Sequence, residues 1–166
     1  MNPSELMDEL GWKLLKALEE DGRLSFAELG RRVGLSTPAV AQRVRRMEDQ
    51  GIIRGYRAEV NPAALGLPIT AFIRMSIVGD VLAPLTERVR RMPEIVECCR
   101  GTGEDSFILK VHVVSVEHLK DVIDRLTPYG TTSTSLVLER LMEARRFTEE
   151  SLEWPRVERR TRRVAG

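Results

Sequence analysis

The chain has 166 residues, of which 42% are hydrophobic and 31% are charged, and its formal net charge is +1. This composition is typical of a soluble protein with room for two small domains, and the low net charge argues against a general nucleic-acid coat. No apolar run approaches the roughly 20 residues that cross a bilayer, and the N-terminus lacks a signal-peptide pattern, so we expect a cytoplasmic protein without a membrane partner.

Positive charge is concentrated in two places. Five arginines lie in residues 36–57 and five in residues 155–166, whereas residues 61–154 are slightly acidic. This distribution is what a local DNA contact and a basic tail over residues 147–166 would produce.

A first helix is predicted before residue 19. Leucines recur there at helical spacing, at Leu10, Leu14, Leu15 and Leu18, and the sequence Glu19-Glu20-Asp21-Gly22 ends the pattern. We expect this helix to pack on the two that follow, because two short helices alone bury too little apolar surface.

A second helix begins at a capping-box pattern. The hydroxyl of Ser25 can accept from a backbone N–H, and the side chain of Glu28 can reach back to the start of the helix. Residues Phe26, Leu29 and Val33 form the predicted buried stripe. Gly34 is expected to end the helix, because glycine adopts the left-handed conformation without a Cβ clash.

A third helix follows the turn Gly34-Leu35-Ser36. Its cap is Ser36 or Thr37, and Pro38 favours Thr37 because proline fits the first helical position. The predicted inward face consists of Val40, Val44 and Met47. Together the two helices have the pattern of a helix-turn-helix.

Along the outward face of the third helix, the first side chains are small, the next bears an amide, and the last are basic. This order suits the major groove of double-stranded DNA. The residues expected in the groove are Ser36, Thr37, Ala39, Gln42 and Arg43, and those expected at phosphates are Arg45, Arg46, Arg54 and Arg57. The alternative is an arginine-rich face that is merely solvated. After Gly51 we expect a strand or an extended arm, and we place a hinge at residues 61–69 between domains 1–60 and 70–146.

The second domain is predicted to have the order βαββαβ. Residues from 70 onward alternate between apolar and other side chains as a strand does, residues 82–92 and 116–126 have helical stripes, and further strands are expected at 95–100, 107–114 and 131–141. This order is that of the ferredoxin-like fold, in which both helices cover one face of an antiparallel sheet. The other face needs a partner, so we expect a homodimer.

These features together resemble the Lrp/AsnC, or feast-famine, family of transcriptional regulators. The resemblance spans residues 7 to about 146 in the segments GRLSFAELGRRVGLS, RVRRMEDQGIIRGY, LGLP, MPEIVECCRGTGEDSF and YGTTSTSLVL. It implies an α+β protein with a winged-type helix-turn-helix domain, a ferredoxin-like (RAM) domain, dimers that often assemble into octamers, and amino acids as effectors. One departure is Gly11, which stands where the family usually has aspartate, and from it we expect a less well defined first helical turn.

The resemblance also implies an effector site near the loop between the second and third strands. The residues concerned are Gly103, Glu104, Asp105 and Ser106 of the loop, with Thr132, Thr134 and Ser135 of the last strand. Carboxylates there would accept from an ammonium group, and hydroxyls or glycine amides would donate to a carboxylate. Ser106 stands where the family often has an acid. The alternative is an ordinary acidic turn beside a solvent-facing strand.

Other chemistry is not indicated. Cys98 and Cys99 are adjacent and offer neither a disulfide framework nor a zinc site, and His112 and His118 have no further ligands at metal spacing. We therefore expect a regulator of transcription without a cofactor and without enzyme activity. Two alternatives stay open: a nucleoid-architecture protein that wraps DNA without an effector, and a ligand-binding protein whose DNA contact is secondary.

Overall fold

The computed structural model describes residues 6–142 and 147–148, which fall into two compact units. Residues 6–58 with 147–148 form the first unit, and residues 59–142 form the second. Apart from residues 147 and 148, the predicted basic tail lies outside the described residues. Within the described part of the chain, no helix is long and apolar enough to cross a membrane.

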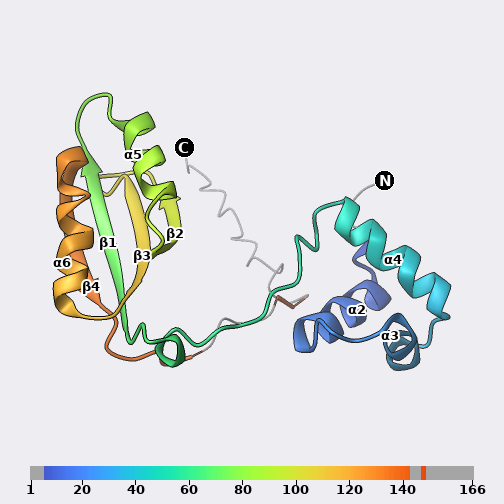
Figure 1. Ribbon diagram of the computed structural model, residues 1–166. Coiled ribbons are helices and arrows are strands. Elements are labelled where there is room, and N and C mark those ends of the chain that lie inside the picture. The colour runs from blue at the N-terminus through green and yellow to red at the C-terminus, as the bar shows by residue number, and fades with distance from the viewer. Residues whose placement is uncertain (1–5, 143–146, 149–166) are drawn as a thin grey trace, which may run out of the picture. The chain divides into compact units, whose positions relative to one another are not determined.

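The first unit is built from helices α2 (Glu9–Glu20), α3 (Phe26–Val33) and α4 (Thr37–Asp49) (Figure 1). Their apolar faces meet in one core, which includes Leu14, Leu18, Leu29, Val33, Val40, Val44 and Met47. The predicted inward face of the third helix is confirmed, since its three members are fully buried. The predicted stripe on α3 is wrong for Phe26, which is 37% exposed because it begins the helix at the rim of the core.

The ends of α3 and α4 are fixed by local hydrogen bonds. The backbone N–H of Glu28 donates to the Ser25 hydroxyl at 3.1 Å, and Gly34 ends α3 in the left-handed region at φ 74°. The cap of α4 is Ser36 and not Thr37, which corrects our expectation: the Ser36 hydroxyl accepts from the N–H of Ala39 at 3.4 Å. Pro38 is then the second helical residue. The N–H groups of the first helical turn have no acceptor within the helix, so proline loses no hydrogen bond at that position, and Thr37 need not be the cap.

The first turn of α2 is well defined, contrary to our expectation from Gly11. Asp8 caps the helix, and its carboxylate accepts from the N–H of Gly11 at 2.8 Å. Gly11 is itself buried, and a Cβ there would lie 1.9 Å from the carbonyl oxygen of Leu6. The glycine therefore allows the chain before α2 to lie directly against the helix.

The chain after α4 is an extended arm rather than a strand. Ile53 is buried against the helices, whereas residues 54–61 have no strand partner. Of our two alternatives for this segment, the described residues show the arm.

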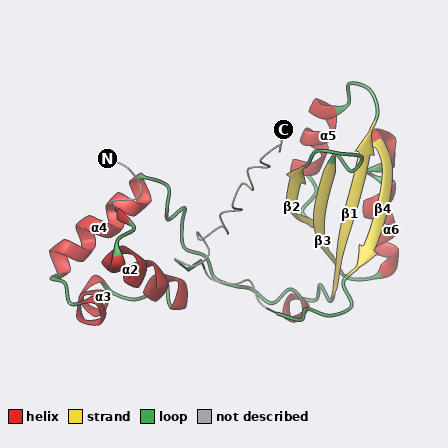
Figure 2. Ribbon diagram, turned by 180° about the vertical axis from the view of Figure 1, so that it is seen from behind, coloured by secondary structure: helices red, strands yellow, loops and turns green. Residues whose placement is uncertain are grey.

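The second unit has the predicted order βαββαβ. Its elements are β1 (Ile69–Ile77), α5 (Leu82–Arg90), β2 (Ile95–Arg100), β3 (Phe107–Val113), α6 (Val116–Asp124) and β4 (Gly130–Leu136), with short 3-10 turns η1 (Ala63–Leu65) and η2 (Thr127–Tyr129). The antiparallel sheet has the order β2-β3-β1-β4. Figure 2 shows the strands in front of both helices, so α5 and α6 cover one face of the sheet and leave the other open.

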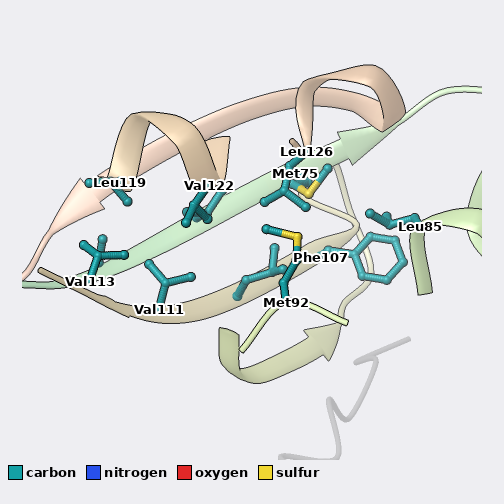
Figure 3. Close-up of a cluster of buried hydrophobic side chains, with 12 residues drawn as sticks. Met75, Leu85, Met92, Phe107, Val111, Val113, Leu119, Val122 and Leu126 are labelled. Atoms are coloured by element: carbon teal, nitrogen blue, oxygen red, sulfur yellow. The ribbon is translucent and has the colours of Figure 1, made fainter. Parts of the chain in front are cut away.

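The core of the second unit lies between the sheet and its two helices. On β1 the buried residues Ala71, Ile73 and Met75 alternate with exposed Phe72 and Arg74, as the period of two predicts. Figure 3 shows residues of this cluster, including Val111 and Val113 of β3 near Leu119 and Val122 of α6.

The last strand is shorter than the predicted residues 131–141. β4 ends at Leu136, whose partner on β1 is Ala71, and one further bond joins the N–H of Val137 to the carbonyl of Thr70 at 2.9 Å. Because β1 begins at Ile69, two residues before Ala71, the strand pairing ends soon after Val137, and the residues further along have no partner on β1.

Candidate DNA-binding and effector sites

The outward face of α4 carries most of the residues that we expected to contact DNA. Ser36, Thr37, Gln42, Arg45 and Arg46 are exposed, whereas Ala39 and Arg43 are half-buried. Gln42, Arg45 and Arg46 lie on the side of the helix away from its buried residues, whereas Ser36 and Thr37 lie at its N-terminal end. They form a surface with hydroxyl groups at the N-terminal end and guanidinium groups further along.

Arg43 is placed differently from the other arginines of α4. Its side chain is only 22% exposed, and its guanidinium forms an ion pair with the carboxylate of Asp8. A further contact runs from the same guanidinium to the carbonyl oxygen of Leu6 at 3.4 Å. Hydrogen bonding from the N–H of Gly11, and then from Arg43, lowers the pKa of Asp8 below its ordinary value.

The arm after α4 is held by Tyr56. Its hydroxyl donates to a carboxylate oxygen of Glu48 at 3.0 Å, and its ring lies over Gly22, where a Cβ would come within 3.3 Å of a ring carbon. Burial, and then the neighbouring Glu48 carboxylate, raises the pKa of Tyr56 to about 12. Arg54 and Arg57 lie on either side of this anchor and are exposed.

The basic residues expected at phosphates are not neutralised within the described part of the chain. No described carboxylate lies within ion-pair distance of Arg45, Arg46, Arg54 or Arg57, whereas Arg31, Arg32 and Arg43 each have an acidic partner. The unit therefore presents four uncompensated positive charges on α4 and the arm. Such a surface attracts a polyanion through its phosphates.

The loop of residues 101–106, where we expect the effector to bind, joins β2 to β3 and is attached to β1. The N–H of Gly101 donates to the carbonyl of Ser106 at 3.0 Å, and Gly103 has φ 103°, in the left-handed region. The hydroxyl of Ser76 donates to the backbone carbonyl of Glu104. The loop is thereby held over the end of β1.

Two residues that we did not expect at this loop contact it: Ser76 at the backbone of Glu104, and Arg74 at the side chain of Asp105. The Nε of Arg74 is 3.7 Å from a carboxylate oxygen of Asp105, and a guanidinium nitrogen of Arg74 lies 3.4 Å from the Ser133 hydroxyl. The alternation of apolar and polar residues along β1 predicts that Arg74 and Ser76 lie on the outward face of the sheet. That alternation was the only sign in the sequence that they could reach a site there. Their pairing with a loop some 30 residues later in the chain is a tertiary contact that the alternation does not contain.

The expected effector residues of β4 do not share one face of the sheet. Thr132 and Thr134 are paired with Met75 and Ile73, so their side chains lie on the helix-covered face, and both are half-buried. Ser135 is paired with Phe72 on the open face, like Ser133 with Arg74. The structure thus brings the hydroxyl of Ser133, and not the three expected side chains together, to Arg74, which in turn contacts Asp105.

The open face of the sheet also carries exposed apolar side chains. Phe72 of β1 is 40% exposed and Ile108 of β3 is 43% exposed, and both alternate with core residues. Val96 on the edge strand β2 is also exposed. This face therefore carries exposed apolar side chains beside its polar ones.

The two histidines are separate and each has a local partner. Nδ1 of His112 lies 3.0 Å from the Thr70 hydroxyl, while Nε2 of His118 lies 3.2 Å from a carboxylate oxygen of Glu94. Burial, and then the charges of nearby basic residues, lowers the pKa of His112. Among the residues that the structure describes, no three acidic, histidine or cysteine side chains are grouped as metal ligands.

Glu94 carries a nearly buried carboxylate in the second unit. The same oxygen that faces His118 accepts from the guanidinium of Arg125 at 2.5 Å, and the carboxylate is only 12% exposed. Burial acts to raise the pKa of Glu94, but the bonds from Arg125 and His118 outweigh it, and the net pKa is lowered. This cluster joins the loop before β2 to α6 and lies away from the effector loop in sequence.

Comparison with known proteins gives the same two-part division. A model of the AsnC-type helix-turn-helix domain matches residues 7–48, and a model of the Lrp/AsnC ligand binding domain matches residues 70–147. The transcriptional regulator LrpC of Bacillus subtilis is 32% identical over 135 residues, which cover 81% of this chain and 94% of LrpC. LrpA of Mycobacterium tuberculosis is 35% identical, over 79% of this chain and 88% of LrpA.

Solved structures agree with the sequence matches. The structure of B. subtilis LrpC has a TM-score of 0.80 at 31% identity and covers 83% of this chain and 99% of that one. The complex of the Neisseria meningitidis regulator NMB0573 with L-Met has a TM-score of 0.76 at 32% identity, over 82% of this chain and 93% of that one. The predicted two-part fold is confirmed by this likeness.

Proposed function

The chain belongs to the Lrp/AsnC family of transcriptional regulators, and from that premise we propose that it binds specific DNA sequences and that an amino acid modulates this binding. In this proposal residues 1–60 contact DNA, residues 61–69 act as a hinge, and residues 70–146 bind the effector and assemble. As in its relatives, the activity is regulation and not catalysis.

The exposed, uncompensated basic face of α4 and the arm is the observation that carries the DNA-binding proposal. Ser36, Thr37, Ala39 and Gln42 would face the base edges, and Arg45, Arg46, Arg54 and Arg57 would face phosphates. An amide such as that of Gln42 can bond adenine on two atoms, whereas a guanidinium binds guanine or a phosphate. The capped start of α4 supports this orientation, because the first turns of a recognition helix enter the groove.

Salt-dependent binding tests this proposal. A duplex would first be selected from a random library with the full chain, and affinity would then be measured by fluorescence anisotropy at several salt concentrations. Arg46→Ala should lower the slope of log K against log salt by about one unit, and Gln42→Ala should cost about 1–3 kcal/mol at one base position. Arg90→Ala is a matched control, because that arginine is 72% exposed on α5 and paired with Glu87.

Two results would count against the proposal. One is failure of the wild-type protein to select any duplex. The other is unchanged affinity of a folded Gln42→Ala, Arg46→Ala double variant for the selected duplex.

For the effector, we propose a free amino acid bound at the loop of residues 103–106. Asp105 and Glu104 supply carboxylates for the ammonium group, and the Gly103 amide and the Ser106 hydroxyl supply donors for the carboxylate. Thr132, Thr134 and Ser135 stay as proposed contacts, with Thr132 and Thr134 reached only from the helix-covered side. Support comes from the Neisseria relative, whose structure contains L-Met.

Melting temperature recorded with each of the twenty amino acids tests the effector proposal. A ligand that binds only the folded protein at 100 times its Kd adds about 2.7 kcal/mol of stability. Asp105→Asn should remove the shift, whereas Asp124→Asn on α6, paired with Lys120 at 2.5 Å, should keep it. If no amino acid raises the melting temperature and footprints lengthen with protein concentration, the protein wraps DNA without an effector.

We also propose that the open face of the sheet forms a homodimer. Exposed Phe72 and Ile108 supply the apolar surface that such an interface needs, and octamers would build on that dimer. Sedimentation of Phe72→Asp at micromolar concentration should show a monomer. Val116→Asp, at a residue 58% exposed on α6, is the control and should stay associated. A monomeric wild-type protein would refute this part.

A further inference from the structure

Arg43 belongs to the DNA-facing helix by sequence but is bonded to the chain that precedes α2. Its guanidinium pairs with Asp8 and lies 3.4 Å from the carbonyl of Leu6, 37 residues earlier in the chain. It is also only 22% exposed, whereas Arg45 and Arg46 on the same helix are exposed. The position of Arg43 at the edge of the buried stripe accounts for this difference.

The Asp8 carboxylate makes two contacts with one oxygen. Oδ1 accepts the N–H of Gly11, which caps α2, and the same oxygen accepts from Arg43 on α4. The absence of a side chain at Gly11 allows the Leu6 carbonyl to approach the helix, where Arg43 also reaches it. The first turn of α2 and the middle of α4 are therefore joined through one carboxylate and one guanidinium.

This arrangement is unfavourable for a contact between Arg43 and a phosphate. Moving the guanidinium to DNA would break a charge-assisted bond and leave the Asp8 carboxylate facing the polyanion without its cation. The positive charge of Arg43 is already balanced locally, and its Nε is buried without a hydrogen-bond partner among the described residues. Arg46 has none of these constraints.

From these contacts we infer that Arg43 is a positioning residue and not a DNA contact. Together with Asp8 it fixes the angle of α4 against α2, and thereby the pose in which Gln42 and Arg46 meet the groove. This inference rests on the proposed DNA-binding function. It assigns the specificity of the recognition helix in part to an ion pair that never touches DNA.

The salt slope separates a positioning residue from a phosphate contact. Using the full chain, its selected duplex and a scrambled duplex, Arg43→Ala should lower affinity for the selected duplex about tenfold while leaving the salt slope as in the wild type. Arg46→Ala, the matched variant one turn away, should lower the slope by about one unit on both duplexes. A drop of about one unit in Arg43→Ala would overturn the inference.

Asp8→Asn provides the second variant. Asparagine still caps α2, since its amide oxygen can accept the N–H of Gly11, but it removes the charge that holds Arg43. The ratio of selected to scrambled affinity should fall about tenfold, and adding Arg43→Ala should lower it no further. An unchanged ratio in Asp8→Asn, or two losses that multiply, would refute the coupling.

These outcomes are distinct from failure of the proposed function. If the wild-type protein selects no duplex, DNA binding itself is wrong. If it selects one but Arg43→Ala behaves like Arg46→Ala, only the positioning role is wrong. Should Arg43→Ala not fold, Asp8→Asn decides alone, because it keeps the size of the side chain and the cap.

Discussion

Replacing Glu94 by alanine is expected to weaken the second unit by about 2 kcal/mol at neutral pH, although the residue lies outside both proposed sites. One of its oxygens accepts from Arg125 at 2.5 Å and from His118 at 3.2 Å, and its other oxygen is buried without a hydrogen-bond partner among the described residues. The substitution removes both bonds and also the buried, unpaired oxygen.

The magnitude follows from these opposing contributions. Two hydrogen bonds to a charged group contribute about 1.5–3 kcal/mol each, and a buried oxygen without a partner costs about 1–3 kcal/mol. About one third of each partner side chain is exposed, 32% for Arg125 and 30% for His118, so water can solvate both after the change. The net loss is therefore roughly 2 kcal/mol, below the roughly 3–5 kcal/mol that breaking a fully buried ion pair costs.

Urea unfolding followed by circular dichroism measures this loss. Glu87→Ala is a matched control, because that carboxylate also faces two arginines, Arg90 at 3.3 Å and Arg91 at 3.4 Å, but is 56% exposed. Its replacement should change stability by no more than about 0.5 kcal/mol. Equal unfolding midpoints for Glu94→Ala and the wild type would refute the reasoning.

The pH dependence supplies a second check with a defined sign. The folded pKa of Glu94 is lowered from its ordinary 4.5, so its contribution is fully present above pH 4.5 and is lost as pH falls through the folded value. The difference between wild type and Glu94→Ala should then shrink on acidification. A difference that grows below pH 4.5 would contradict the assignment of the charge.

Three further outcomes are expected. Gly11→Ala should lower stability by about 1–3 kcal/mol despite a helix-propensity gain of about 1 kcal/mol, because its Cβ would meet the Leu6 carbonyl; an unchanged melting temperature would contradict this. Tyr56 should ionise near pH 12 in an ultraviolet titration, and its contribution to folding stability, present below pH 10, should be lost as pH rises through 12. Glu48→Gln should lower the pKa of Tyr56, and an unchanged titration curve in that variant would exclude the contact. Deleting the chain after Pro155 should weaken specific and random DNA binding by similar factors and reduce the salt slope, whereas a retained slope would show a merely solvated tail.

The elements of the fold could be predicted because their signals are local. The cap at Ser25, the glycine at 34 and the alternation along β1 each depend on residues within a few positions of one another, and the structure has all three. The order of strands and helices then restricts the sheet to few topologies. The choice between Ser36 and Thr37 failed because proline is compatible with either of the first two helical positions.

The two candidate sites were harder to predict from the sequence, because they depend on contacts between residues far apart in the chain. Arg43 has the spacing of a surface residue, and only its partner Asp8, 35 residues away, shows that its guanidinium is already bonded. In the same way, Thr134 and Ser135 are neighbours in the sequence but lie on opposite faces of β4. The Ser133 hydroxyl lies near the Arg74 side chain, and only the register of β4 against β1 places it there.

The irregular pairing of β2 has a consequence for how the chain behaves at high concentration. β2 is an edge strand, and its register against β3 shifts between Ile95 and Glu97, so that Val96 interrupts the ladder. Such a bulge twists the strand and breaks the even row of backbone groups that a foreign strand would need for pairing. Charged Glu97 and Arg100 flank the exposed cysteines and add to this protection. The edge that carries apolar Ile95 and Val96 is thereby a poor template for aggregation while newly made chains fold.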